Sequence, residues 1–323
     1  MQTYAKLFHL PHHKSEYLSL LYIVALIRTF VFLLLGLFLP VFILNIFLED
    51  GFSQKNALFL VVIAFFFLQV THGLLVTLVS KINARFGTKA GFLIGQFFLT
   101  LFLLLLFSSE NTSLVIISFL VLGTAAAFYW ISYHTFFLEV GKQKKFGEAL
   151  GILEMLGVST GFIAPILASI IITFFGFKTL FFVSLALVQL TMVLLIFVRD
   201  REKLGSVNFF DIKNEILGGK RDFISFVGAG AEEIIYSVAW PLLLFTVFQS
   251  YIKVGIISAT VVLTAGVVAL IVGKLSDRLE KSKIEKFGSA LIALTFIGRI
   301  FLQTPIFLYV LDSFYKIFSI LFY

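Results

Sequence analysis

The chain has 323 residues, of which 60% are hydrophobic and only 13% are charged. A soluble domain of this length has no interior large enough for so many apolar side chains, so most of the chain is expected to contact lipid. The net charge of +7 is spread over several short polar stretches, which argues against a nucleic-acid-binding protein, and the absence of cysteine excludes disulfides and thiol chemistry.

Ten apolar segments are long enough to cross a bilayer, which requires about 20 helical residues each. The backbone has no hydrogen-bond partners in hydrocarbon except its own, so each segment is predicted to be an α-helix. The sequence therefore predicts an all-α polytopic membrane protein. The segments cover residues 20–47, 57–79, 90–107, 114–138, 149–174, 179–198, 223–248, 254–273, 287–303 and 306–323.

The lysines and arginines predict the orientation in the membrane. Nineteen of the 25 precede the first segment or lie in loops on the same side of the membrane, whereas only Lys55, Lys178 and Lys253 lie in loops on the opposite side. Loops rich in Lys and Arg remain in the cytoplasm. We therefore expect a multi-pass protein of the plasma (cytoplasmic) membrane whose N-terminus is cytoplasmic.

The longest polar stretch lies between the sixth and seventh segments, at residues 199–222. We interpret it as a cytoplasmic linker between an N-terminal six-helix bundle, residues 1–198, and a C-terminal bundle, residues 223–323. A monomer embedded in the lipid bilayer is expected, without a nucleic-acid partner.

A charged loop motif occurs once in each of these two parts. Gly273-Lys274-Leu275-Ser276-Asp277-Arg278 separates the eighth and ninth segments, and a weaker copy between Ser80 and Lys89 separates the second and third. A loop that recurs once per half indicates two related halves, an organisation typical of secondary transporters.

The motif resembles that of the major facilitator superfamily, whose loop after the second helix of each half reads Gly-x-Leu-Ala/Ser-Asp-Arg-x-Gly followed by two basic residues. The stretch that begins at Gly273 matches the first six positions and departs at Glu280. The resemblance implies a six-helix N-terminal half, an incomplete four-helix C-terminal half, and a latch on the cytoplasmic side. The residues that would form this gate are Gly273, Asp277, Arg278, Arg85 and Gly87.

Members of that family usually have twelve helices, whereas ten are predicted here. We therefore expect a sequence truncated after the tenth helix. The alternative is a natural ten-helix transporter of the drug/metabolite-exporter type. Those exporters divide into five plus five helices, whereas the repeated loop here divides the chain into six helices and the rest.

Ionisable residues inside the spans are candidates for substrate and ion handling, because each costs about 2.5–3.5 kcal/mol at the bilayer centre. In the resembled family helices 1, 4, 7 and 10 line the central cavity, and most of the charges within the spans fall on these helices. Arg28 is expected to pair with a glutamate of helix 7 or to bind an anionic substrate. Asp312 and Lys316, spaced i to i+4, are expected to neutralise each other.

Aromatic residues within one turn of these groups are candidates for stacking or cation–π contact with a ligand, although ordinary packing explains many of them in a chain with 42 phenylalanines. The predicted substrate and proton pathway comprises Arg28, Tyr129, Trp130, Tyr133, His134, Glu154, Glu232, Glu233, Tyr236 and Trp240. No catalytic group, metal site or cofactor is predicted.

The function predicted from these features is secondary active transport of a small solute by alternating access, with coupling to protons through Glu232 or Glu233. The protein is not expected to be an enzyme. The alternative from another class is a non-transport membrane protein such as a lipid-handling enzyme, in which His, Asp and Glu would cluster at one membrane interface.

Overall fold

The structure, a computed structural model, describes residues 12–141, 146–198, 219–276, 281–301 and 304–322. Within these ranges the chain is helical and contains no strand, and each of the ten predicted segments coincides with helix. The helices of the first six segments are α2 (His12–Gly36), α3 (Leu39–Glu49), α4 (Gln54–Phe86), α5 (Thr88–Phe107), α6 (Thr112–Gly141) and α7 (Phe146–Ile196). Those of the last four are α9 (Lys220–Ile234), the π-helical turn η1 (Ile235–Ala239), α10 (Trp240–Phe248), α11 (Tyr251–Ser276), α12 (Lys281–Phe301) and α13 (Pro305–Phe322).

Two of the predicted spans are irregular near a proline. The first span bends by 41° between α2 and α3, just before Pro40, which is the second residue of α3. The seventh span passes through η1 immediately before Pro241. Proline lacks the N–H group that an α-helix needs and disfavours helical geometry in the preceding residue, so both irregularities have a local cause.

Two glycines make the sharp turns between antiparallel spans. Gly87, between α4 and α5, has φ 87° and ψ 164°, and Gly176 divides α7 into two helices with φ 79° and ψ 172°. This combination of angles is essentially restricted to glycine. The fifth and sixth predicted spans are therefore the two parts of α7.

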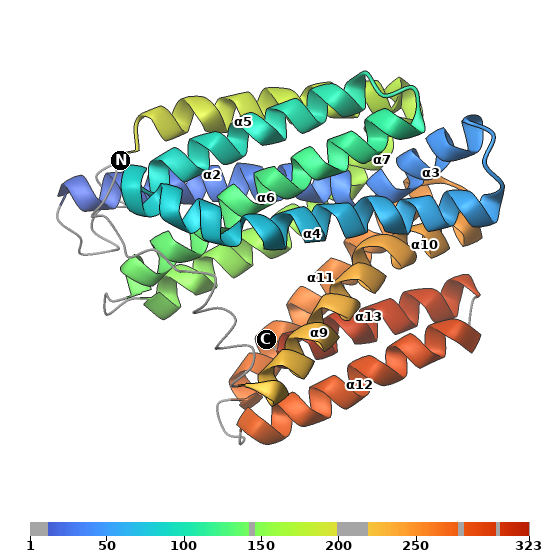
Figure 1. The fold of residues 1–323 in the computed structure, drawn as a ribbon. Coiled ribbons are helices and arrows are strands. Elements are labelled where there is room, and N and C mark those ends of the chain that lie inside the picture. Colours follow the sequence, from blue (N-terminus) through green and yellow to red (C-terminus); the bar gives the residue numbers. More distant parts are fainter. Residues whose placement is uncertain (1–11, 142–145, 199–218, 277–280, 302–303, 323) are drawn as a thin grey trace.

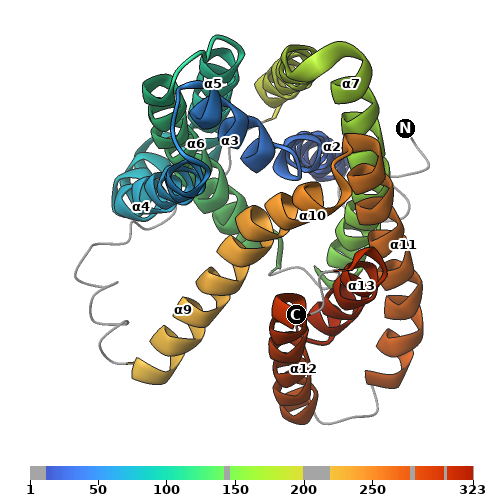
Figure 2. The same ribbon diagram turned by 90° about the vertical axis from the view of Figure 1, so that its right-hand side faces the viewer.

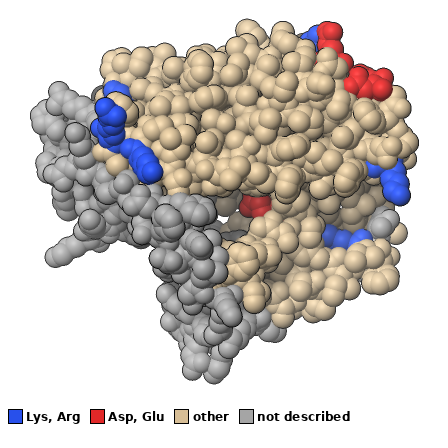
Figure 3. Space-filling view, in the orientation of Figure 1, with Lys and Arg blue, Asp and Glu red and all other residues tan. Residues whose placement is uncertain are grey.

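Six helices of the described chain are long and apolar enough to cross a membrane, or seven if the bent pair α2–α3 counts as one span. Most of the charged side chains visible in Figure 3 lie toward the two ends of the molecule, and the broad band between them is uncharged except for one acidic group beside the hollow. This distribution is that of a protein whose middle lies in hydrocarbon.

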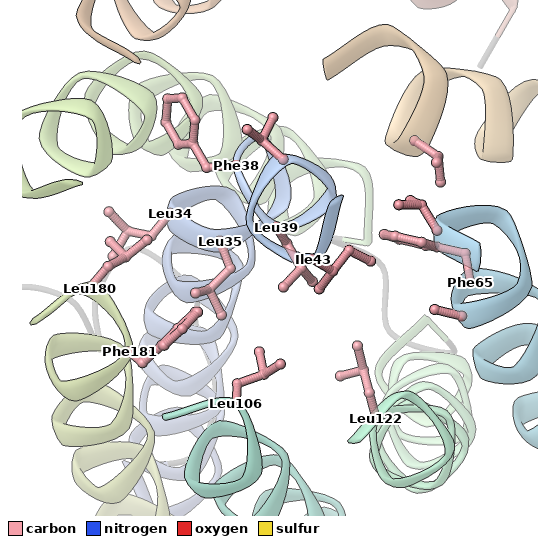
Figure 4. Packing of buried hydrophobic residues seen from close by; sticks show 14 of the residues in the cluster. Leu34, Leu35, Phe38, Leu39, Ile43, Phe65, Leu106, Leu122, Leu180 and Phe181 are labelled. Carbon is pink, nitrogen blue, oxygen red and sulfur yellow. The ribbon is translucent and has the colours of Figure 1, made fainter. Parts of the chain in front are cut away.

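The main apolar core joins helices α2 to α7 and extends into α10 (Figure 4). Leu34 and Phe38, near the bend, belong to this core. Leu106, Leu122 and Phe181 join it from the surrounding helices. Lipid chains are as apolar as leucine, so close van der Waals packing, more than removal from water, holds these helices together.

The helices α9 and α10 run between the group formed by α2 to α6 and the group formed by α11 to α13 (Figures 1 and 2). α7 packs against α2 and α5 of the first group and against α11 of the second, and so connects the two groups. At Gly255 of α11, a Cβ atom would lie 2.6 Å from the carbonyl oxygen of Pro165 in α7, so only glycine permits this approach.

A cluster of aromatic rings joins the two groups at the end of the molecule where α3 ends. Tyr251, the first residue of α11, makes edge contacts with Phe38 at 5.8 Å and with Phe177 at 5.6 Å between ring centroids, and stacks on Phe245 of α10 at 4.8 Å. The two groups are thus in contact at this end, and a small hollow opens between them nearer the middle of the molecule (Figure 3).

Candidate functional site

Arg28 lies inside the N-terminal group of helices, with 1% of its surface exposed. Its Nη1 donates a hydrogen bond of 2.6 Å to Oε1 of Gln96 on α5, and Nε2 of Gln96 donates in turn to Oγ1 of Thr191 on α7. The guanidinium carbon lies 3.6 Å from the centroid of the Tyr129 ring on α6. One arginine of α2 is therefore linked to α5, α6 and, through Gln96, α7.

The aromatic residues predicted on α6 form a continuous set of ring contacts that begins at Arg28. Tyr129 stacks on Tyr133 at 5.6 Å, and Trp130 stacks on His134 at 5.6 Å. Tyr129 is buried, whereas Trp130 is 43% exposed. The contacts thus connect a buried cation to an exposed surface of α6.

A second cluster lies among the last helices, and its centre is an ion pair. Nη2 of Arg299 on α12 lies 3.0 Å from Oδ1 of Asp312 on α13, and both side chains are buried. The Arg299 guanidinium lies 3.8 Å from the centroid of the Trp240 ring.

The predicted residues Glu232 and Tyr236 belong to this second cluster. Oε1 of Glu232 accepts a hydrogen bond of 3.0 Å from the hydroxyl of Tyr315, and Tyr236 stacks on the same tyrosine at 4.7 Å. Nζ of Lys316 lies 4.3 Å from the centroid of Tyr236. Glu233, one residue further along, is exposed. Only one of the two adjacent glutamates therefore makes a hydrogen bond to α13, as expected for side chains about 100° apart around a helix.

The structure departs from two expected pairings. Arg28 bonds to Gln96 and not to a glutamate of helix 7, because its side chain points into the N-terminal group of helices. The ion-pair partner of Asp312 is Arg299 and not Lys316. Spacing of i to i+4 makes a pair on one helix feasible, but the neighbouring helix α12 offers a guanidinium, and Lys316 lies instead over an aromatic ring.

The predicted pathway does not include Arg299, Asp312 or Tyr315, and Asp312 was expected only to neutralise Lys316. The signal that could have identified Arg299 is the cost of its charge within a span. An intramembrane arginine requires a partner, and Asp312 was the aspartate nearest to it in the last two segments.

In the first copy of the loop motif, the described residues have structural partners. Gly87 makes the turn between α4 and α5, and the Arg85 guanidinium lies 5.2 Å from the centroid of the Phe86 ring. Nζ of Lys89 donates a hydrogen bond of 2.7 Å to the carbonyl oxygen of Ile196 at the end of α7. The loop therefore ties the third helix to the sixth.

Several predicted residues lie outside the described part. Gly273 lies in the last two turns of α11, but Asp277 and Arg278 of the same motif fall outside the described residues, as does most of the predicted linker, residues 199–218. Glu154 lies within α7, but its side chain is not among those that the structure describes. Among the residues that are described, no group of three or more His, Asp or Glu side chains could hold a metal ion.

Comparisons with known proteins identify the type of protein. The family model of the Major Facilitator Superfamily matches residues 21–322. A protein of Bacillus subtilis strain 168, described as the uncharacterized protein YqgE, is 25% identical over 233 residues, which are 70% of this chain and 53% of that protein. This chain thus spans about half the length of its curated relative. Among solved structures, that of a D-xylose-proton symporter matches with a TM-score of 0.68 and 12% identity, over 94% of this chain and 80% of that one.

Proposed function

Because the chain belongs to the Major Facilitator Superfamily, we propose that it acts as a secondary transporter that moves a small solute by alternating access, coupled to protons. Transport, and not catalysis, is the activity that this family membership supports. The fold agrees, because two groups of helices pack against each other through α7 and α11 and leave a hollow between them elsewhere (Figure 3). Membership of this superfamily also separates the chain from the ten-helix drug/metabolite exporters.

The observation that carries the proton coupling is the buried Arg299–Asp312 ion pair. Two charges removed from water are stabilised only by each other and by hydrogen bonds, so loss of one charge changes the relation of the two helices. Protonation of Asp312 neutralises the partner of Arg299 and weakens the contact between α12 and α13. Glu232 is tied to the same helix through Tyr315, so protonation of either carboxylate acts on α13.

The placement in the membrane is part of the same proposal. We place the protein in the plasma membrane as a monomer, with its N-terminus and the loops that carry most of the lysines and arginines in the cytoplasm. Residues 1–198 and 223–323 are the two units that move relative to each other. The Tyr251 cluster of rings then closes the external side in the conformation described here.

The test is solute movement in proteoliposomes that contain the purified protein, with and without an imposed pH gradient. Asp312→Asn and Glu232→Gln each remove one ionisable proton site at nearly constant size. If the proposal holds, wild-type protein accumulates solute when the gradient is imposed, and at least one variant loses accumulation but retains exchange of solute down its own gradient.

The matched control is Glu110→Gln, which removes a carboxylate from an exposed position between α5 and α6. This variant is expected to respond to the gradient as the wild type does. If Asp312→Asn and Glu232→Gln both accumulate solute like the wild type, these carboxylates do not couple transport to protons. If the wild type moves none of a broad panel of solutes, the transport function itself is wrong.

A further inference from the structure

The Arg28 guanidinium carries an unfilled hydrogen-bonding edge. Its Nε and Nη2 atoms are buried and have no hydrogen-bond partner in the described structure, whereas Nη1 is occupied by Gln96. Nε–H and Nη2–H point in the same direction along one side of the guanidinium plane. This pair of donors matches the two oxygen atoms of a carboxylate, which arginine binds by two parallel hydrogen bonds.

Among the described residues the charge of Arg28 also has no counterion. Within the described residues no carboxylate oxygen lies within 4.0 Å of it, and its contacts are an amide and the rings of Tyr129 and Phe32. A buried cation without a partner is costly, and cation–π contact offsets only part of the cost. A single unpaired positive charge favours a ligand that carries a single negative charge.

Arg299 differs from Arg28 both in its remaining hydrogen-bond donors and in having a carboxylate partner. The donor that Arg299 gives to Asp312 is Nη2, and the two donors that remain unpartnered are Nε and Nη1. Nε and Nη1 do not lie on the same edge of the guanidinium, and the carboxylate of Asp312 already balances the charge of Arg299. Of the two arginines that are buried in the described part of the chain, only Arg28 therefore retains a complete two-donor edge and has no carboxylate partner there.

We propose that Arg28 binds the carboxylate of an organic monoanion, and that this anion is the transported solute. The proposal rests on the proposed transport function. The carboxylate oxygens accept hydrogen bonds from Nε and Nη2, while Gln96 holds Nη1 and Tyr129 covers one face of the guanidinium. The aromatic residues of α6, from the exposed Trp130 to the buried Tyr129, lie between the surface and this site and favour an anion with a planar apolar body.

The test is ligand-induced thermal stabilisation of the purified full chain in detergent, with benzoate, butyrate and inorganic phosphate as probes and benzamide as the neutral isostere of benzoate. A ligand that binds only the folded protein raises the Tm in proportion to the logarithm of its concentration relative to Kd. Benzoate or butyrate is expected to raise the Tm, and benzamide is expected not to. Stabilisation by phosphate alone, or only when anionic phospholipid is added, would assign the edge to a phosphate group and overturn the carboxylate proposal.

Three variants determine whether Arg28 is the binding group. Arg28→Lys keeps the charge but removes the two-donor edge, so the apparent affinity for the carboxylate should fall by about tenfold or more. Gln96→Glu places a counterion beside Arg28, so it should raise the Tm without ligand and abolish the response to carboxylate. Lys178→Gln removes an exposed lysine at the other end of the molecule and should respond like the wild type.

The outcomes separate this inference from the transport proposal. A carboxylate response that is unchanged in Arg28→Lys and Gln96→Glu refutes the site, as does the absence of any response to the carboxylates. Proteoliposomes that transport neutral solutes independently of Arg28 leave the transport function intact and refute the inference. Binding of carboxylate that depends on Arg28, without transport of any solute, supports the site and refutes the function.

Discussion

Asp50 and Thr112 join the end of one helix to the beginning of another. Oδ2 of Asp50, which follows α3, accepts a hydrogen bond of 2.6 Å from the backbone N–H of Thr112 and one of 2.5 Å from its hydroxyl. Thr112 is the first residue of α6, where backbone N–H groups have no partner within the helix. A carboxylate at this position also interacts favourably with the helix dipole. The contact fixes the loop between the first two spans against the fourth.

These hydrogen bonds predict a pH dependence of stability. The side-chain and backbone bonds from Thr112 hold the pKa of Asp50 below its ordinary value of 3.8. A lowered pKa in the folded state stabilises the fold above the pKa of the unfolded state, and this contribution is lost as the pH falls through the folded pKa. The Tm of Asp50→Asn should lie below that of the wild type at about pH 6, and the difference should shrink toward about pH 3. A difference that is constant over this range would contradict the assignment.

The turns at Gly87 and Gly176 predict the effect of adding one methyl group. Both residues have backbone angles that are nearly restricted to glycine, so Gly87→Ala and Gly176→Ala should each lower the free energy of unfolding by about 1–3 kcal/mol. Gly73→Ala is the control, because Gly73 lies within α4 and a Cβ there would meet no atom within 4 Å. That variant should be slightly more stable than the wild type. Equal effects of the three substitutions, measured by denaturant titration, would show that the turns are not strained.

The Arg299–Asp312 pair predicts non-additive mutations. Asp312→Leu leaves a buried guanidinium unpaired and should cost about 3–5 kcal/mol of stability. The double variant Arg299→Met/Asp312→Leu removes both charges and should be more stable than Asp312→Leu alone. A double-mutant cycle of unfolding free energies measures the coupling. Purely additive effects would mean that the two side chains do not depend on each other.

The orientation predicts which engineered cysteines an impermeant reagent reaches. The chain contains no cysteine, so a single one reports its own position. Ser113 near the start of α6 and Lys81 near the end of α4 are both exposed and lie on opposite sides of the proposed membrane. In intact cells Ser113→Cys should be labelled and Lys81→Cys should not, whereas both should react after permeabilisation. Labelling of Lys81→Cys in intact cells would reverse the proposed topology.

The amino-acid sequence by itself determined the number, type and approximate limits of the helices. Lipid-exposed helices require long apolar segments with internally bonded backbones, and this requirement is local and can be read residue by residue. The bend before Pro40, the π-helical turn before Pro241 and the turns at Gly87 and Gly176 are also local, because the backbone of each residue imposes them. The loop motif is likewise a pattern of consecutive residues, so the sequence alone was enough to indicate the family.

Only the tertiary structure decided which charged groups meet. Asp312 could be assigned to Lys316 by spacing along one helix, but its ion-pair partner is Arg299 of α12, which spacing along α13 cannot identify. Arg28 was expected to meet a carboxylate and instead contacts Gln96 and Tyr129. Such contacts depend on how helices rotate and cross as they pack. Van der Waals fit between helices sets this arrangement, and no single segment of the sequence contains that information.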